Sequence, residues 1–159
     1  MADSERLVRV NWDGTLTVDE AVRLRNDVVD CGLYQVYGFH EVFGPEALLY
    51  IGRTDNQTFA LRIAQHRPWL RHVMDCRIRI GRLRDDDYKL EPPNWHDWLG
   101  LQQSVEGLTI YWHSPPYNSQ GIVRYAGLNV RVQNLGNRGR LLPEYSARFG
   151  ELARPAEAK

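Results

Sequence analysis

Residues 32–52 read GLYQVYGFHEVFGPEALLYIG, and this stretch predicts two neighbouring strands of a sheet. Residues 31–37 and 47–51 are rich in the aromatic and branched aliphatic side chains that favour strands. Residues 38–45 contain two glycines and a proline, which are typical of a loop. We therefore expect a hairpin whose two strands are joined by a long loop.

The sequence on either side of this hairpin predicts further helices and strands. Helical spacing of apolar residues predicts helices over residues 19–29 and 57–66, and from residues 94–97 to 112. We expect Pro68 to end the second helix, because proline lacks the backbone N–H that a helix needs. Other patterns predict a small hairpin with its turn at residues 11–14, a strand over 74–83, a turn at 85–87 and a strand over 128–133. The predicted fold class is therefore mixed α/β.

The composition is that of one globular domain, with 159 residues of which 43% are hydrophobic and 25% are charged. No apolar run approaches the roughly 18 residues that cross a bilayer, and residues 1–6 lack the layout of a secretory signal. We therefore expect a cytoplasmic protein with no membrane partner. The two cysteines have no spacing typical of a disulfide framework or a zinc site.

The charges are unevenly distributed, although the formal net charge is zero. Residues 53–84 contain eight arginines and two acidic residues, whereas residues 85–97 contain five acidic residues and one lysine. Arginine carries a planar fork that suits phosphate contacts better than the ammonium group of lysine does. The pattern indicates a basic surface able to contact a nucleic-acid backbone, although arginine preference in the genome explains it equally well.

Several polar side chains follow one another along these elements in a distinctive order. Tyr34 lies in the first strand of the hairpin and Tyr50 in the second, while Arg62 and His66 lie one turn apart on the next helix. Glu106 lies on the last helix.

This order resembles that of the GIY-YIG endonuclease family. Gly32-Leu33-Tyr34 matches the first family motif with leucine in place of isoleucine, and Leu49-Tyr50-Ile51-Gly52 matches the second. Arg62-x-x-x-His66 is similar to the helix motif, with Arg67 as a competing arginine. Glu106 and Pro115-x-x-Asn118 are similar to the acidic helix and the closing turn.

The resemblance implies a nuclease core over residues 32–119, built on a three-stranded antiparallel sheet flanked by helices. Residues 1–31 would then form an N-terminal extension packed on the core, and residues 120–150 a C-terminal extension with one strand. A flexible tail is expected over residues 151–159. The implied activity is metal-dependent hydrolysis of phosphodiester bonds in DNA.

The resemblance also implies roles for individual side chains. Glu106 would hold one divalent metal ion, magnesium, for which manganese can substitute. Arg62 would bind the scissile phosphate and stabilise the charge of the transition state. Tyr34 would act as general base or orient the attacking water, and Tyr50 and His66 would complete the contacts to water and phosphate. His66 is the rival general base.

Other residues are expected to support this chemistry. Gly32, Gly52 and Asn118 would have structural roles, and Arg53, Arg67 and Arg71 would contact backbone phosphates. The implied substrate is DNA, cut either by a restriction-type enzyme or by a structure-selective one. A homodimer would cut both strands, and a partner protein would be an alternative source of specificity. The competing hypothesis is a catalytically silent GIY-YIG scaffold that binds nucleic acid or protein without cutting.

Overall fold

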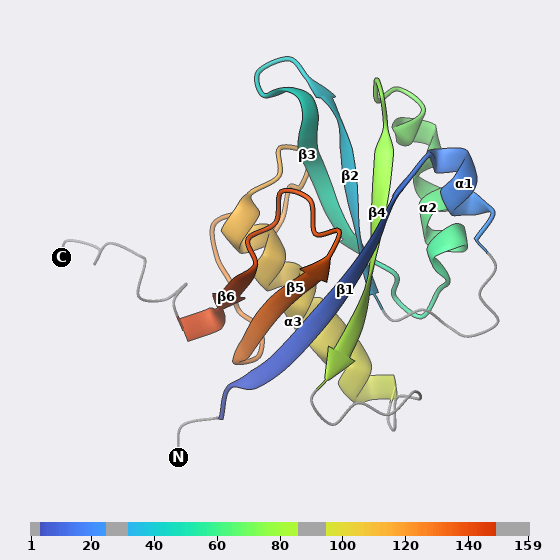
Figure 1. The fold of residues 1–159 in the computed structure, drawn as a ribbon. Helices are drawn as coiled ribbons and strands as arrows, with labels where there is room; N and C mark the ends of the chain where they lie inside the picture. Colours follow the sequence, from blue (N-terminus) through green and yellow to red (C-terminus); the bar gives the residue numbers. More distant parts are fainter. Residues whose placement is uncertain (1–3, 25–31, 86–94, 149–159) are drawn as a thin grey trace.

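The computed structural model describes residues 4–24, 32–85 and 95–148. In this part of the chain, six strands form one mixed sheet in the order β3-β2-β4-β1-β5-β6, and three helices pack beside it (Figure 1). The strands are β1 Arg6–Leu16, β2 Gly32–His40, β3 Gly44–Arg53, β4 Arg77–Asp85, β5 Val130–Gly136 and β6 Glu144–Ser146. The helices are α1 Val18–Val22, α2 Phe59–Leu70 and α3 Trp95–His113. The mixed α/β fold class is confirmed.

The sheet separates two hydrophobic cores. Side chains of α3 share one core with those of β1 and β5, which includes Leu101 and Val105 together with Val8 and Val132. Side chains of α1 and α2 pack against the other face of β2 and β4. Figure 1 shows the same arrangement, with α1 and α2 on one side of the sheet and α3 on the other. None of the described helices has the length and apolar character needed to cross a membrane.

The sheet is larger than the expected three-stranded one, because the segments on either side of residues 32–119 contribute strands. β1 lies between β4, to which it is antiparallel, and β5, to which it is parallel. The short strand β6, which has no clear sequence signal, pairs with β5.

The expected N-terminal hairpin is wrong. Residues 6–16 form the single strand β1, which continues through Asn11 and Gly14. Residues 11–14 favour a turn, but pairing with strands on both sides keeps them extended. The only irregularity in the pairing of β1 with β4 is a register shift between Asp13 and Leu16.

Two further boundaries differ from expectation. β2 and β3 extend until His40 pairs with Gly44, so residues 38–45 are not one long loop. Gly44 adopts a φ of 80°, which lets the chain reverse within few residues. Helix α2 continues past Pro68 to Leu70: the proline gives up one backbone hydrogen bond, and the burial of Leu70 in the core offsets this loss.

The first expected helix is shorter than residues 19–29. A capping box formed by Thr17 and Glu20 starts α1, and the helix ends at Val22. Residues 23 and 24 are not helical, and residues 25–29 of that prediction lie outside the described residues, as do residues 86–87 of the expected turn and the tail at 151–159. Asp85 itself is the last residue of β4.

Candidate active site

Glycines allow close packing around Tyr34. Tyr34 of β2 is opposite Gly52 of β3, and its side chain is fully buried on the face covered by α2. A methyl group at Gly52 would collide with the Tyr34 hydroxyl and ring. A methyl group at Gly32 would collide with the Gly81 carbonyl oxygen and the Phe59 ring. The glycines of both motifs are therefore required for close packing.

His66 of α2 links Tyr34 to Trp69. The Tyr34 hydroxyl lies 2.7 Å from His66 Nε2, and the Trp69 indole N–H donates to His66 Nδ1 over 3.0 Å. Indole nitrogen is only a donor, so Nδ1 must carry the lone pair of the neutral ring. The ring proton is then on Nε2 and is donated to the Tyr34 oxygen. The only lone pair of His66 is consequently occupied by Trp69.

The protonation of this pair follows from burial. Burial raises the pKa of Tyr34 far above its ordinary value, and the neighbouring Tyr50 adds to the shift. Burial also lowers the pKa of His66, with the positive charge of Arg62 acting in the same direction. Near neutral pH the pair therefore consists of a phenol and a neutral imidazole.

Arg62 is held beside the end of β3. Its Nε donates to the Arg53 carbonyl oxygen over 3.2 Å, and one Nη nitrogen lies 3.8 Å from an Asp55 carboxylate oxygen. About a quarter of the side chain is exposed, at 26%. The arginine is therefore fixed next to the tyrosines while part of its guanidinium group faces solvent.

Glu106 of α3 closes the other side of the site. Its Oε1 accepts a hydrogen bond from Arg53 Nη1 over 2.8 Å, and Arg53 also pairs with Asp55. Burial raises the pKa of Glu106 to about 7; the charge of Arg53 opposes this shift and that of Asp55 increases it. The carboxylate is thus present at neutral pH but is easily protonated.

Gln102 positions this part of α3. Its side-chain amide donates to the Gly32 carbonyl oxygen over 3.0 Å and to the Thr54 hydroxyl over 2.9 Å. Its Oε1 accepts from the Asp55 backbone N–H over 3.2 Å. Gln102 lies one helical turn before Glu106, so these bonds set the position of Glu106 relative to β2 and β3.

Asn118 completes the edge of β3. Its Oδ1 accepts from the Ile51 N–H over 3.0 Å, and its Nδ2 donates to the Ile51 carbonyl oxygen over 2.9 Å. The side-chain amide therefore replaces a neighbouring strand at this point. Tyr50, Arg53 and Glu106 line a pocket of about 320 Å³ at this edge.

The pocket fits a hard divalent cation with few protein ligands. Glu106 supplies one buried carboxylate, and the described residues contain no cluster of three or more His, Cys, Asp or Glu side chains. Magnesium commonly takes one or two protein carboxylates and fills its remaining positions with water and phosphate oxygens. A zinc ion with three or four protein ligands does not fit this donor set.

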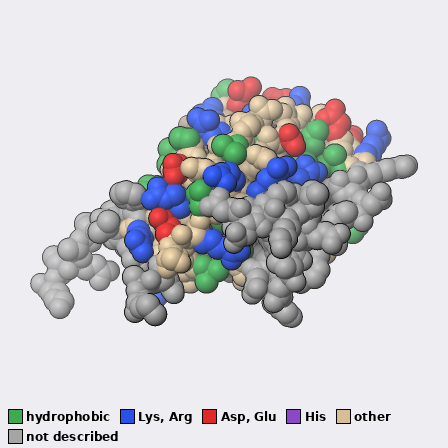
Figure 2. Space-filling view, turned by 60° about the horizontal axis from the view of Figure 1, so that its bottom comes forward, with side chains coloured by type: hydrophobic (Ala, Val, Ile, Leu, Met, Phe, Trp, Pro, Cys, Tyr) green, Lys and Arg blue, Asp and Glu red, His purple; other side chains and the backbone are tan. Residues whose placement is uncertain are grey.

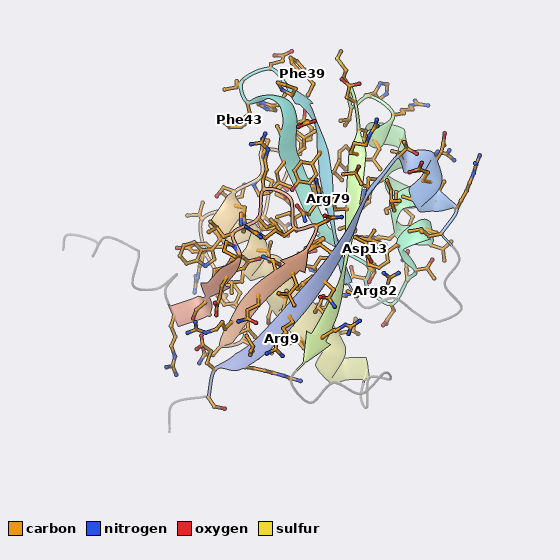
Figure 3. All side chains as sticks on the ribbon, viewed as in Figure 1. Arg9, Asp13, Phe39, Phe43, Arg79 and Arg82 are labelled. Atoms are coloured by element: carbon orange, nitrogen blue, oxygen red, sulfur yellow. The ribbon has the colours of Figure 1, made fainter. Side chains whose placement is uncertain are left out.

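Aromatic rings continue from the pocket to the tip of the β2–β3 hairpin. Tyr50 contacts Trp69 with ring centroids 5.4 Å apart, and Trp69 contacts Tyr117 at 6.3 Å. Tyr117 contacts His40 at 6.0 Å, and His40 stacks on Phe43 at 4.8 Å. Figure 3 shows Phe43 at the hairpin tip beside Phe39. This aromatic row gives flat apolar surface next to the site.

Two of the arginines expected to contact phosphate lie apart from this cluster. Arg67 pairs with Asp19 of α1 over 2.6 Å, and Arg71 Nε lies 3.4 Å from His72 Nε2. In the view of Figure 2, basic side chains lie among acidic and hydrophobic ones instead of forming a separate surface.

The structure thus brings together Tyr34, Tyr50, Arg62, His66 and Glu106, with Arg53 and Asn118 at their side. Sequence reasoning did not single out Asp55, Trp69 or Gln102. The spacing of Trp69 and Gln102, one turn from His66 and Glu106 respectively, is the signal that would have found two of them.

Comparison of the chain with models of protein families, with curated proteins and with solved structures finds no match.

Proposed function

We propose that this chain is a metal-dependent DNA endonuclease of the GIY-YIG type. The observation that carries the proposal is the convergence of two tyrosines, an arginine, a histidine and a glutamate from β2, β3, α2 and α3. Tyr34 hydrogen-bonds His66, Arg62 is bound to the end of β3, and Glu106 is joined to that same end through Arg53. Hydrolysis of a phosphodiester requires proton transfer, positive charge at the phosphate and an acidic metal ligand, and this cluster offers all three.

The hydrogen-bond pattern favours Tyr34 over His66 as the group that contacts the attacking water. The His66 lone pair is occupied by the Trp69 indole, whereas the buried Tyr34 hydroxyl accepts from His66 and has its own proton to donate, either to Tyr50 beside it or to a water that enters there. The charge of Arg62 opposes the rise in the pKa of Tyr34 that burial causes. In this proposal Tyr34 orients the water, and His66 is a positioning residue.

Glu106 is the residue that would hold magnesium, or manganese in its place. When bound, such an ion supplies positive charge for the phosphate and lowers the pKa of its water. Arg53 competes for the same carboxylate. A DNA phosphate entering the pocket would offer Arg53 an anion in place of Glu106, and Glu106 would then be free of its arginine partner.

The test compares wild type with Glu106→Gln on supercoiled and branched DNA, with magnesium, with manganese and with EDTA. We expect metal-dependent cutting by wild type and none by Glu106→Gln, while DNA binding is retained. Glu144→Gln is the matched control, because Glu144 also pairs with an arginine, Arg131, but lies on β6. Cutting by Glu106→Gln refutes the metal-ligand assignment, and binding without cutting by wild type favours the silent scaffold.

A further inference from the structure

A second pocket, of about 390 Å³, lies on the opposite face of the sheet from Tyr34. Tyr37 is three residues beyond Tyr34 along β2, so the alternation of the strand places its side chain on the other face. Arg77 and Arg79 of β4 line this pocket together with Arg140 from the segment between β5 and β6. None of the residues of the candidate active site lines it.

The three guanidinium groups of this arginine pocket are held without being neutralised. Arg77 donates to the Cys76 carbonyl oxygen over 3.0 Å, Arg79 to that of Asn137 over 3.0 Å, and Arg140 to that of Glu46 over 2.7 Å. Within the described ranges, none of the three has a carboxylate within 4.0 Å. Arg53 of the active site, by contrast, has two.

Arg79, which lines the pocket, is held by several contacts. Its guanidinium lies over the Tyr37 ring, 5.2 Å from the centroid. The Tyr37 hydroxyl donates to Gln35 and accepts from the Arg140 backbone N–H over 3.0 Å. Figure 3 shows Arg79 near the middle of the sheet. These contacts set the orientation of the guanidinium before any ligand arrives.

One donor of Arg79 is left over. Its Nε is buried and, in the part of the chain that the structure describes, has no hydrogen-bond partner. Buried N–H groups are nearly always paired, so this one indicates a missing acceptor. Gly139 approaches closely, at a φ of 62°, and a methyl group there would collide with Tyr37 and come within 2.9 Å of Arg79 Nε. The backbone at Gly139 therefore packs closely against Tyr37 and Arg79.

Two carboxylates, Glu46 and Asp75, also line the pocket. The three arginines still leave an excess of one positive charge. Neither acid forms an ion pair with them, so both can accept hydrogen bonds from a ligand that carries donors as well as an anion. Sugar hydroxyls and base amino groups are such donors.

We propose that the arginine pocket binds a phosphoryl group, carried by a free nucleotide or by the backbone of a nucleic acid. Arginine forks match the oxygens of phosphate, and the arrangement around Arg79 is already formed. This proposal does not depend on the endonuclease activity, because the arginine pocket lies on the other face of the sheet and shares no residue with the candidate active site.

The test is an NMR titration of the full ¹⁵N-labelled chain that follows Arg79 Nε–Hε. The probes are inorganic phosphate, thymidine monophosphate and a short single-stranded oligonucleotide. We expect Arg79 Nε–Hε to shift, and Arg77→Gln to weaken binding about tenfold, as for the loss of one charge-assisted hydrogen bond. Arg77 is exposed, and among the described residues its side chain bonds only the Cys76 carbonyl oxygen, so the variant should fold.

Arg23→Gln is the control, because Arg23 is an exposed arginine at the C-terminal end of α1 and its loss removes the same charge. Binding of phosphate and thymidine monophosphate identifies a free ligand, whereas binding of the oligonucleotide alone identifies a backbone phosphate. The proposal is overturned if no probe shifts Arg79 Nε–Hε, or if Arg23→Gln weakens binding as much as Arg77→Gln. Glu106→Gln should bind as wild type does, whatever the outcome of the cleavage assay.

Discussion

Arg53 donates from Nη1 to Glu106 Oε1 across 2.8 Å, and this ion pair joins the end of β3 to the middle of α3. The carboxylate is largely buried, with 15% of its side chain exposed, so it depends on this arginine for its charge. A proton, the Arg53 guanidinium group and any cation that enters therefore compete for the Glu106 carboxylate.

The first prediction concerns the pH dependence of stability. Burial raises the pKa of Glu106 from 4.5 to about 7, so the folded protein holds a proton that the unfolded chain releases. The free energy of unfolding contributed by Glu106 is thus complete below pH 4.5 and falls as pH rises through 7, by about 3 kcal/mol for a shift of this size.

Urea unfolding of wild type and Glu106→Gln across this pH range measures that contribution. The difference between the two proteins should change with pH, because only wild type has the titrating carboxyl group. Parallel profiles for wild type and Glu106→Gln would contradict the raised pKa.

Trp69→Phe should change the protonation of His66. The substitution removes the N–H that occupies His66 Nδ1, so we expect the pKa of His66 to rise and the protein to lose about 1 kcal/mol of stability. The pKa is measured by NMR titration of the imidazole protons. Trp112→Phe is the matched control, because the buried Trp112 indole nitrogen has no hydrogen-bond partner within the described residues. An unchanged His66 titration would refute the assigned tautomer.

Gly52→Ala should displace Tyr34. The added methyl group would occupy the space of the phenol hydroxyl, and overpacking of this kind costs about 1–3 kcal/mol. We expect a lower melting temperature and, if the chain is a nuclease, slower cleavage. Gly100→Ala is the control, since nothing lies within 4 Å of the added group and alanine favours the helix. If Gly52→Ala were as stable as wild type, β3 or Tyr34 would have to shift at no cost to make room for the methyl group.

Arg62→Ala should lower single-turnover cleavage more than it weakens DNA binding. A positive group that acts on the transition state contributes about 100-fold or more to the rate. Rates and dissociation constants are measured on the same DNA. Arg67→Ala serves for comparison, because Arg67 lies on the same helix but pairs with Asp19. Equal losses of rate and affinity for Arg62→Ala would make Arg62 a binding residue only.

Tyr117→Ala should distinguish substrates with unpaired bases from intact duplexes. The Tyr117 ring is 47% exposed within the aromatic row, and a base stacked on such a ring gains about 1–3 kcal/mol. We expect weaker binding of branched or single-stranded DNA and little change for duplex. Tyr117→Phe keeps the ring and should bind normally. An equal effect of Tyr117→Ala on both DNA forms would argue for a restriction-type substrate.

Local patterns predicted the elements that carry strong periodicity. The hairpin strands and the helix over residues 95–113 are present, because alternation and helical spacing act over many residues. The prediction of an N-terminal hairpin was wrong, because residues 11–14 alone do not indicate that β4 and β5 pair with this strand on either side. Partner strands are chosen by the tertiary fold, which short windows of sequence do not contain.

Some contacts of the candidate site could also be predicted from the sequence, and others could not. The proximity of Tyr34 and Gly52 follows from the hairpin, and that of Arg62 and His66 from one helical turn. The Arg53–Glu106 ion pair joins residues far apart in the chain, and no spacing rule predicts it. The tautomer of His66 likewise depends on geometry that only the three-dimensional structure provides.

The central position of β1 has a consequence for the order of folding. β1 precedes both of its partners in the chain, and β4 and β5 are synthesised much later. β2, by contrast, pairs with β3 and with β4, which follow it directly as the next two strands in the chain. Because distant contacts close slowly, we expect Val8→Ala in β1 to speed unfolding without slowing folding. The tyrosine motifs would then be assembled on an early, local half of the sheet, which the N-terminal strand afterwards joins to the other half.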